Sequence, residues 1–557
     1  MRTDQIPSFE EYYEKLIYDL RLTVLHGMGY RERDARRPFI AVMHGWNEIS
    51  PGHIHLRPIA EQVKIGVAQG GGTPAEVIVP GICGSVSGGA PSFRYNIPYR
   101  DFAAAMAEIM LELGRFDGAV LIPTCDNVVP AYLMAAARVN IPSVLLTGGY
   151  MRPGCYEGQP LTIQDTQRAH GRYLKGDITE QDVDNIVRHA CGGPGACPEM
   201  GTANTMCSVS EVLGMSFPGN ATIPADSPVL SHLAKTVGER AVELVREGTR
   251  PSEIMTEKAC HNAMKLVLAV GGSTNAVIHL PAMARELDIE IPLDLWDELS
   301  RETPFICSIR PNNPAYTMVD LARAGGIPAV MKEMGELLDL NLPTVTGRTL
   351  EENVAHASVF DRTVIRPLED PFSREGAIAV LKGNLAPEGA IVKQSAVSEA
   401  MLCRTGPAKV FDSEEGAIEG LQSGRIERGD VVVVRYEGPK GSPGAREVFN
   451  LAHFITASGL DADVSVITDG RFSGTNKGGA VGHICPEAME GGPIALLRDG
   501  DLITIDVDNR RLEVNLTEEE LANRARDWVP PEPRAKKGVL AAYARLVSSL
   551  STGATVF

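Results

Sequence analysis

Short apolar runs alternate with amphipathic stretches along the first two thirds of the chain. The runs Phe39–Met43, Val77–Val79, Ala119–Ile122 and Ser143–Thr147 are rich in Val, Ile and Leu, and an amphipathic stretch that begins at Ala131 separates the last two. Strand, helix and strand in this order are typical of buried parallel strands joined by crossover helices. The pattern predicts an N-terminal α/β domain built on a parallel sheet.

A different pattern begins after roughly residue 380. Gly429–Arg435 and Val464–Thr468 are strand-like, and Leu502–Val507 and Arg511–Asn515 form two alternating runs separated by a turn. Few long helical patterns lie between these runs. The sequence therefore predicts a smaller, β-rich C-terminal domain.

The length of the chain also favours two domains. At 557 residues it exceeds what one hydrophobic core usually organises. The Pro/Gly-containing stretch Gly383–Gly389 is the best candidate for the boundary. We therefore expect domains at residues 1–382 and 383–557.

Charge and hydropathy exclude several classes of function. The formal charge is −18 and no basic stripe offsets it, so we expect no nucleic-acid partner and no binding to anionic membranes. The first residues lack the apolar region of a signal peptide, and no apolar run reaches the roughly 18 residues that a membrane helix needs. These features predict a cytoplasmic protein. Its ten cysteines should be mostly reduced, and no CxxC pair indicates structural zinc.

Three of the cysteines lie in Gly/Pro-rich turns at the ends of apolar runs. They are Cys83, Cys125 and Cys197, and the first two each follow a predicted strand by a few residues. Ligands of open α/β sheets gather beyond the carboxyl ends of strands, so these positions suit a shared site. Three separated thiols in a reducing compartment indicate an iron–sulfur cluster better than disulfides. The alternative for each is a small buried side chain, which is our interpretation of the other seven cysteines; among those, Cys191 is the nearest alternative ligand.

Six motifs follow one another along the chain: Trp46–Pro51, Pro123–Asp126, Gly201–Met206, Gly271–Ala276, Tyr436–Gly441 and Thr468–Gly474. In this order they resemble the dihydroxy-acid dehydratase/phosphogluconate dehydratase family over nearly the whole chain. The C-terminal tail is more similar to the branched-chain members than to the sugar-acid members.

The resemblance implies a fold, a reaction and a set of site residues. It implies an N-terminal α/β domain, a C-terminal β-barrel-like domain, a site in the cleft between them, and assembly into homodimers or homotetramers. The implied reaction removes water from a 2,3-dihydroxy carboxylic acid to give a 2-keto acid, with an iron–sulfur cluster and Mg²⁺ as cofactors. Cys125 and Cys197 match two cluster ligands, and Ser473 matches the serine base. Asp126 and Glu447 match acidic residues of the magnesium site.

The chain also departs from the family pattern. Gly52 stands where the branched-chain type has its third cluster cysteine, and Cys83 falls where phosphogluconate dehydratases have a cysteine of their own. Cys83 is therefore the candidate third ligand. Gly84 and Asn127 replace an aspartate and a lysine of the magnesium site, which removes negative charge around a hard cation.

Two classes of function remain open. The first is an active hydro-lyase on a small branched-chain dihydroxy acid or, alternatively, a sugar acid, with a two-iron or four-iron cluster. The second is a divergent relative that binds a small acid or a protein partner without dehydrating it. Ser473, Glu447 and the Cys125–Asp126 pair favour the first.

Overall fold

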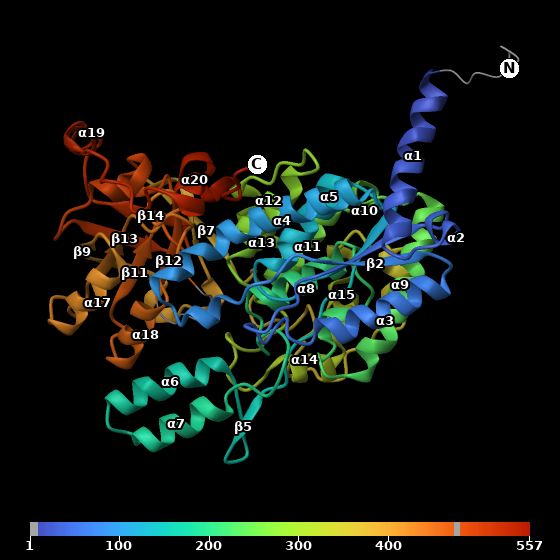
Figure 1. Cartoon of the computed structure of the whole chain (residues 1–557). Helices are drawn as coiled ribbons and strands as arrows, with labels where there is room; N and C mark the ends of the chain where they lie inside the picture. Colours follow the sequence, from blue (N-terminus) through green and yellow to red (C-terminus); the bar gives the residue numbers. More distant parts are fainter. Residues whose placement is uncertain (1–8, 473–478) are drawn as a thin grey trace, which may run out of the picture.

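Four parallel strands form the sheet predicted for the N-terminal part of the chain. The computed structural model describes residues 9–472 and 479–557 (Figure 1). The strands β1 (Phe39–His44), β2 (Thr73–Ile78), β3 (Gly118–Ile122) and β4 (Ser143–Leu145) lie in the order β2-β1-β3-β4, and all neighbouring pairs are parallel. Every residue of β1 and β3 is buried, as expected for a sheet covered on both faces.

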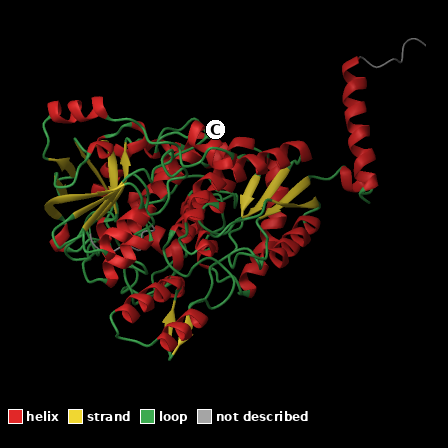
Figure 2. Cartoon of the chain, turned by 60° about the vertical axis from the view of Figure 1, so that its left-hand side comes forward, coloured by secondary structure: helices red, strands yellow, loops and turns green. Residues whose placement is uncertain are grey.

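Helices cover this sheet and fill the space between it and the barrel (Figure 2). One of them, α8, is buried at all of its positions, as is typical of a helix in the centre of a large domain. The α-helices are α1 (Phe9–Gly27), α2 (Glu32–Ala35), α3 (Leu56–Gln69), α4 (Asn96–Gly114), α5 (Val128–Val139), α6 (Ile163–Leu174), α7 (Glu180–His189), α8 (Thr202–Val212), α9 (Pro228–Glu247), α10 (Pro251–Ile254), α11 (Glu257–Ala269), α12 (Ala276–Arg285), α13 (Leu293–Glu302), α14 (Met318–Ala324), α15 (Gly326–Met334), α16 (Leu350–Val354), α17 (Glu414–Gln422), α18 (Asn450–Ala457), α19 (Glu518–Asp527) and α20 (Gly538–Leu546).

The C-terminal part forms a closed barrel of eight strands. Their order is β10-β11-β12-β8-β7-β14-β13-β9, with parallel and antiparallel pairs. The barrel and the parallel sheet confirm the predicted fold class. The strands are β7 (Ala379–Gly383), β8 (Ala386–Val392), β9 (Cys403–Phe411), β10 (Val431–Val434), β11 (Ser465–Thr468), β12 (Ala480–Cys485), β13 (Leu502–Asp506) and β14 (Arg511–Val514).

The stretch 383–389 is a hairpin within the barrel and not a linker. It connects β7 to β8, which pair antiparallel, so barrel strands lie on both sides of it. Gly383, at φ +155°, ends β7, and the glycine and proline that suggest a linker serve equally well in a tight turn. The division into domains at residue 382 stays a prediction.

Two parts of the chain stand away from the main body. The helix α1 projects from it, and α6 and α7 form an arm with the hairpin β5 (Gly154–Tyr156) and β6 (Gln159–Leu161) (Figure 1). The arm is not isolated, because α6 packs against α18 next to the barrel. No helix in the described ranges is long and apolar enough to cross a membrane.

Candidate active site

The thiols of Cys83, Cys125 and Cys197 line one cavity of about 380 Å³. Cys83 follows β2 and Cys125 follows β3, and these strands flank β1, so both loops leave the same edge of the sheet. The thiols of Cys83 and Cys125 are hydrogen-bonded to each other. The third thiol comes from the loop before α8, where the amide of Asn204 donates to the carbonyl of Cys197 (2.6 Å).

The backbone places each thiol in a constrained position. Cys125 has φ +69°, in the left-handed region that favours glycine, and such strain is typical of functional sites. Cys83 is the N-cap residue of the 3-10 helix Gly84–Ser87, and its carbonyl oxygen accepts from the backbone N–H of Val86 (3.2 Å). The nearby backbone N–H groups of Ser85 and Val86 favour negative charge on the sulfur.

The electrostatic surroundings shift the pKa values of the three thiols in different directions. The hydrogen bond from Cys125, together with the backbone donors, lowers the pKa of Cys83 to about 6. The same contact and burial raise the pKa of Cys125, and burial raises the pKa of Cys197. The pKa of the Cys83 thiol is therefore the lowest of the three. Thiolates are the form that binds iron, so the lowered pKa of Cys83 suits a cluster ligand.

The three thiols do not form a site for a single ion. Nowhere in residues 9–472 or 479–557 do three His, Cys, Asp or Glu side chains converge on one metal position. An iron–sulfur cluster has several irons, and its ligands surround a larger space than the ligands of one ion do. Three thiols that share the wall of one cavity suit that arrangement.

Gly52 lies directly against the sulfur of Cys125. A Cβ atom at position 52 would be 2.2 Å from the Cys125 Sγ, far inside van der Waals contact. The absence of a side chain at Gly52 therefore leaves the space that the Cys125 thiol occupies. This explains how Gly52 and Cys83 occur together: the chain offers its third thiol from the loop after β2 instead of the loop after β1.

We expect Gly52→Ala to disturb the thiol site. The added methyl must displace Cys125, and overpacking of this kind costs about 1–3 kcal/mol. The midpoint of urea denaturation should fall and less iron should be incorporated. Gly27→Ala is the matched control because a Cβ at Gly27 meets no atom within 4 Å. Normal stability and normal iron content in Gly52→Ala would show that the position is not tightly packed against Cys125.

The two predicted acidic residues, Asp126 and Glu447, line the cavity next to the thiols. Burial and the nearby Glu447 raise the pKa of Asp126 to about 7. Glu447 is 5% exposed and accepts hydrogen bonds from Asn275 (2.9 Å) and Arg471 (3.1 Å). The predicted acidic pair thus lies together, but an arginine already neutralises one of its members.

This donor set fits Mg²⁺ poorly. Mg²⁺ prefers several anionic oxygen ligands, and the guanidinium of Arg471 occupies an oxygen of Glu447. At Gly84 a side chain would contact Phe93 and Asn96 (2.8 and 2.9 Å), so a longer residue there would need rearrangement. Asn127 is buried and brings a neutral amide instead of an anion.

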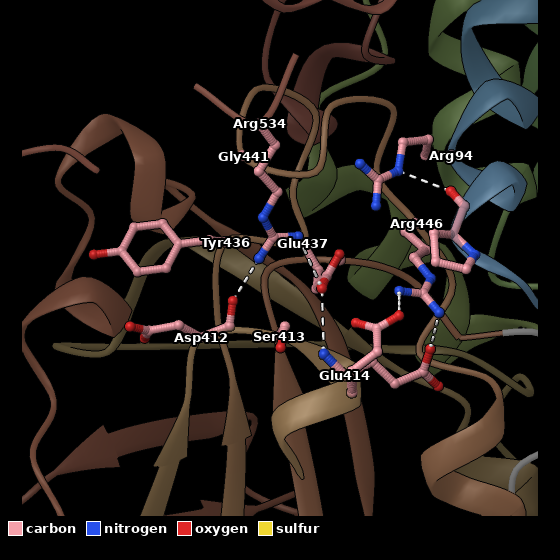
Figure 3. A network of polar contacts seen from close by, with 12 residues as sticks. Arg94, Asp412, Ser413, Glu414, Tyr436, Glu437, Gly441, Arg446 and Arg534 are labelled. Atoms are coloured by element: carbon pink, nitrogen blue, oxygen red, sulfur yellow. Dashed lines mark hydrogen bonds and ion pairs between the residues drawn. The ribbon is translucent and has the colours of Figure 1, made fainter. Parts of the chain in front are cut away.

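A network of ion pairs surrounds Arg446, the residue before Glu447 (Figure 3). Arg446 pairs with Glu414 (2.7 Å) and Glu415 (2.5 Å), and it donates to the carbonyl of Gly89 in the wall (3.2 Å). Glu414 also accepts from the backbone N–H groups at the start of α18, including that of Asn450 (2.6 Å). The network therefore fixes the loop after Cys83 to the barrel.

Three further residues of the cavity wall lie outside the sequence motifs. Gln164 and Gln167 come from the first turns of α6, and Glu199 follows Cys197 by two positions. Because Glu199 lies two positions after a predicted cluster ligand, the sequence could have indicated it as a site residue. Two glutamines three residues apart on a helix give no such signal. Ser473, the predicted base, lies outside the described residues; Arg471 and Phe472, just before it, are buried.

Comparisons with known proteins identify the family. The sequence models for the dihydroxy-acid/6-phosphogluconate dehydratase N-terminal and C-terminal regions match residues 37–353 and 363–554. A dihydroxy-acid dehydratase of Ruminiclostridium cellulolyticum is 47% identical over 96% of this chain and 97% of its own length. Dihydroxy-acid dehydratases of Acetivibrio thermocellus (48%, 95% of each chain) and Methanosarcina barkeri (45%, 96% and 97%) are similar over the same span.

These matches place the chain among the hydro-lyases, the enzymes that remove water from a substrate. It belongs to the dihydroxy-acid/6-phosphogluconate dehydratase family. The resemblance inferred from the motifs is confirmed.

Proposed function

We propose that the chain dehydrates a 2,3-dihydroxy carboxylic acid to a 2-keto acid, with an iron–sulfur cluster bound by Cys83, Cys125 and Cys197. The observation that carries the proposal is the convergence of these three thiols with Asp126 and Glu447 on one cavity. The names of the relatives support a dihydroxy acid as substrate. Within that class, the sequence analysis favours a branched-chain acid used in amino-acid biosynthesis and leaves a sugar acid as the alternative.

The reaction requires two bonds to break. The C2–H bond and the C3–O bond break, and the C2 proton and the C3 hydroxyl leave together as water. The resulting enol becomes the 2-keto acid when a proton is added at C3. An open iron in a cluster supplies a Lewis acid for the C3 hydroxyl oxygen. The chain itself must supply a base at C2 and a closed surface around the substrate.

Different residues of the chain are proposed to act as the base, to bind the substrate hydroxyl and to hold the cavity wall. Ser473 is the proposed base that takes the C2 proton; this role comes from its position in the family motif. Glu447 is held by Asn275 and Arg471, so it is a rigid acceptor for a substrate hydroxyl. The network around Arg446 keeps the wall closed between the helical region and the barrel.

The test is formation of a 2-keto acid by protein purified without oxygen. A branched-chain and a five-carbon sugar-derived 2,3-dihydroxy acid are each supplied, and the keto acid is trapped as a hydrazone. We expect turnover of at least one of them. Binding of either acid without any keto acid, by protein that contains iron and sulfide, would favour the non-catalytic alternative.

We expect only weak dependence on magnesium. The predicted magnesium ligands are Asp126 and Glu447, and Glu447 is paired with Arg471, so millimolar Mg²⁺ should be needed for any activation. Chelator-treated, cluster-loaded enzyme is titrated with MgCl₂ to measure this. Saturation at micromolar Mg²⁺ would show that other residues complete a strong site.

The proposed assembly is a homodimer or homotetramer in the cytoplasm. Its support is the apolar surface of α1, where Tyr12, Leu20 and Val24 are more than half exposed, and of α4, where Leu113 is 81% exposed. Two such helices on one chain suit burial against a second copy. Light scattering of the purified protein gives the mass; a monomer at micromolar concentration would contradict this part of the proposal.

A further inference from the structure

We infer that the loop after β1 positions the three thiols of the candidate site, with His53 and Asn47 as its positioning residues. This β1 loop, residues 45–53, carries no cysteine of its own. The inference rests on the proposed function, because it names the residues that hold the proposed cluster ligands. Three contacts carry it, one with each of the chain segments that bear a thiol.

The β1 loop lies between the segments that carry Cys83 and Cys125. In the sheet β1 is the neighbour of both β2 and β3, and all three strands are parallel. Their carboxyl ends therefore meet at one edge, where Cys83 follows β2 and Cys125 follows β3. The central loop can contact both neighbouring segments without leaving that edge.

The first contact joins His53 to the segment of Cys125. His53 is 0% exposed, and its Nε2 donates to the carbonyl of Thr124, the residue before Cys125 (3.0 Å). A carbonyl only accepts, so the ring carries a proton on Nε2. Burial lowers the pKa of His53 to about 4, so the ring is neutral and its Nδ1 accepts from the hydroxyl of Ser50 (2.7 Å). One ring thus ties the β1 loop to the backbone next to Cys125.

The same ring is packed tightly against two glycines. A Cβ atom at Gly81 would be 2.2 Å from the Nε2 of His53, and one at Gly45 would be 2.9 Å from its Cδ2. Both glycines therefore leave space that the ring fills, and the ring has one orientation available to it. Because Gly81 lies two positions before Cys83, this packing also fixes the approach to the second thiol.

The second contact joins Asn47 to the segment of Cys83. The amide Nδ2 of Asn47 donates to the carbonyls of Gly81 (2.7 Å) and Gly45 (3.1 Å), and the backbone N–H of Gly81 donates to the carbonyl of Gly45 (2.8 Å). An amide nitrogen offers two N–H donors, which a serine or an ionised aspartate of similar size does not. Asn47 thereby holds together the start of the β1 loop and the chain before Cys83.

The third contact joins the β1 loop to the segment of Cys197. The backbone N–H of Gly195 donates to the carbonyl of Pro51 (2.9 Å), two positions before Cys197. Gly195 has φ +121°, and a Cβ atom there would be 2.4 Å from the backbone nitrogen of Met151, so a side chain at this position would prevent the contact.

Each contact therefore meets the chain within two residues of a thiol. The loop thus holds all three ligand segments from one side, although it supplies no ligand itself. Groups that orient metal ligands from outside typically change metal affinity or activity by about 10–100-fold when they are lost. This gives the motif at Trp46–Pro51 a role in a chain that has Gly52 in place of a cysteine.

The experiment replaces His53 by an apolar ring. His53→Phe fills nearly the same space and removes both hydrogen bonds. Transfer of iron from the cluster-loaded variant to bipyridine should be at least about tenfold faster than from the wild-type protein. In cluster-free protein, alkylation of Cys125 by iodoacetamide, mapped by mass spectrometry, should also be at least about tenfold faster, because the segment opens locally.

Two further variants separate positioning from general loss of stability. His53→Gln retains an N–H donor for Thr124 and should recover most of the wild-type behaviour. Asn47→Ala should accelerate alkylation of Cys83 more than that of Cys125, whereas His53→Phe should do the reverse. General loss of stability would instead accelerate alkylation of every buried cysteine, including Cys260.

The matched control is Asn262→Leu. Asn262 is 2% exposed and joins α11 to Asp339 by two hydrogen bonds (2.8 and 2.9 Å), but it does not line the cavity. This change also removes two buried hydrogen bonds, so it should lower the midpoint of urea denaturation while leaving iron transfer and the alkylation of Cys125 unaltered.

Wild-type rates of iron transfer and of Cys125 alkylation in His53→Phe would overturn the inference, and so would an equal acceleration in Asn262→Leu. If His53→Phe does not fold, Asn47→Ala decides by the same two measurements, with Cys83 as the reporting thiol. Wild-type protein without iron and sulfide would count against the proposed function. The alkylation rates need no cluster, so they test the inference in that case as well.

Discussion

Cys125→Ser and Cys197→Ser are each expected to abolish the iron–sulfur absorption of the protein and its dehydratase activity. Both residues line the cavity, and each supplies one of the three thiols that the described residues place there. A serine hydroxyl stays protonated at neutral pH and binds iron poorly compared with a thiolate. Visible absorption and iron content of the anaerobically purified variants measure the effect.

Control variants separate loss of a ligand from general damage. Cys155→Ser and Cys403→Ser change exposed cysteines that do not line the cavity, so both should retain normal absorption. Cys83→Ser tests the unusual third ligand. An unaltered spectrum in that variant would mean that Cys83 only packs in its loop, and normal spectra in Cys125→Ser and Cys197→Ser would refute the ligand assignment.

Ser473→Ala is expected to lower kcat by several orders of magnitude while leaving the cluster spectrum and melting temperature nearly unchanged. Loss of a catalytic base removes the step at C2, whereas the loss of one hydroxyl has little effect on stability. Stopped assays over hours measure the residual rate. Ser252→Ala, at an exposed position, is the control. Near-normal turnover in Ser473→Ala would remove the serine from the mechanism.

The regular elements of the fold could be predicted from the chain because their patterns are local. The run at Phe39–Met43 falls within β1, and the alternating runs at 502–507 and 511–515 form the hairpin of β13 and β14. The boundary stretch was harder to interpret because glycine and proline are equally common in linkers and in tight hairpins. Gly383 belongs to such a hairpin, and only the pairing of β7 with β8 reveals it.

The candidate site could be predicted only in part. Cys83 and Cys125 follow strands, and parallel strands bring their carboxyl ends to one edge, so their proximity follows from the pattern. The contact of Gly52 with the Cys125 sulfur depends on a loop conformation with φ +69° at Cys125, which no local pattern indicates. Gln164 and Gln167 reach the cavity only because the arm folds back on α18.

The iron and acid-labile sulfide content of the anaerobically purified wild-type protein, measured together with its 2-keto acid formation, tests the central claim most directly. We expect iron and sulfide in equal amounts, about two or four of each per chain, and a turnover rate that rises in proportion to them. Full dehydratase activity in protein that contains neither iron nor sulfide would contradict it.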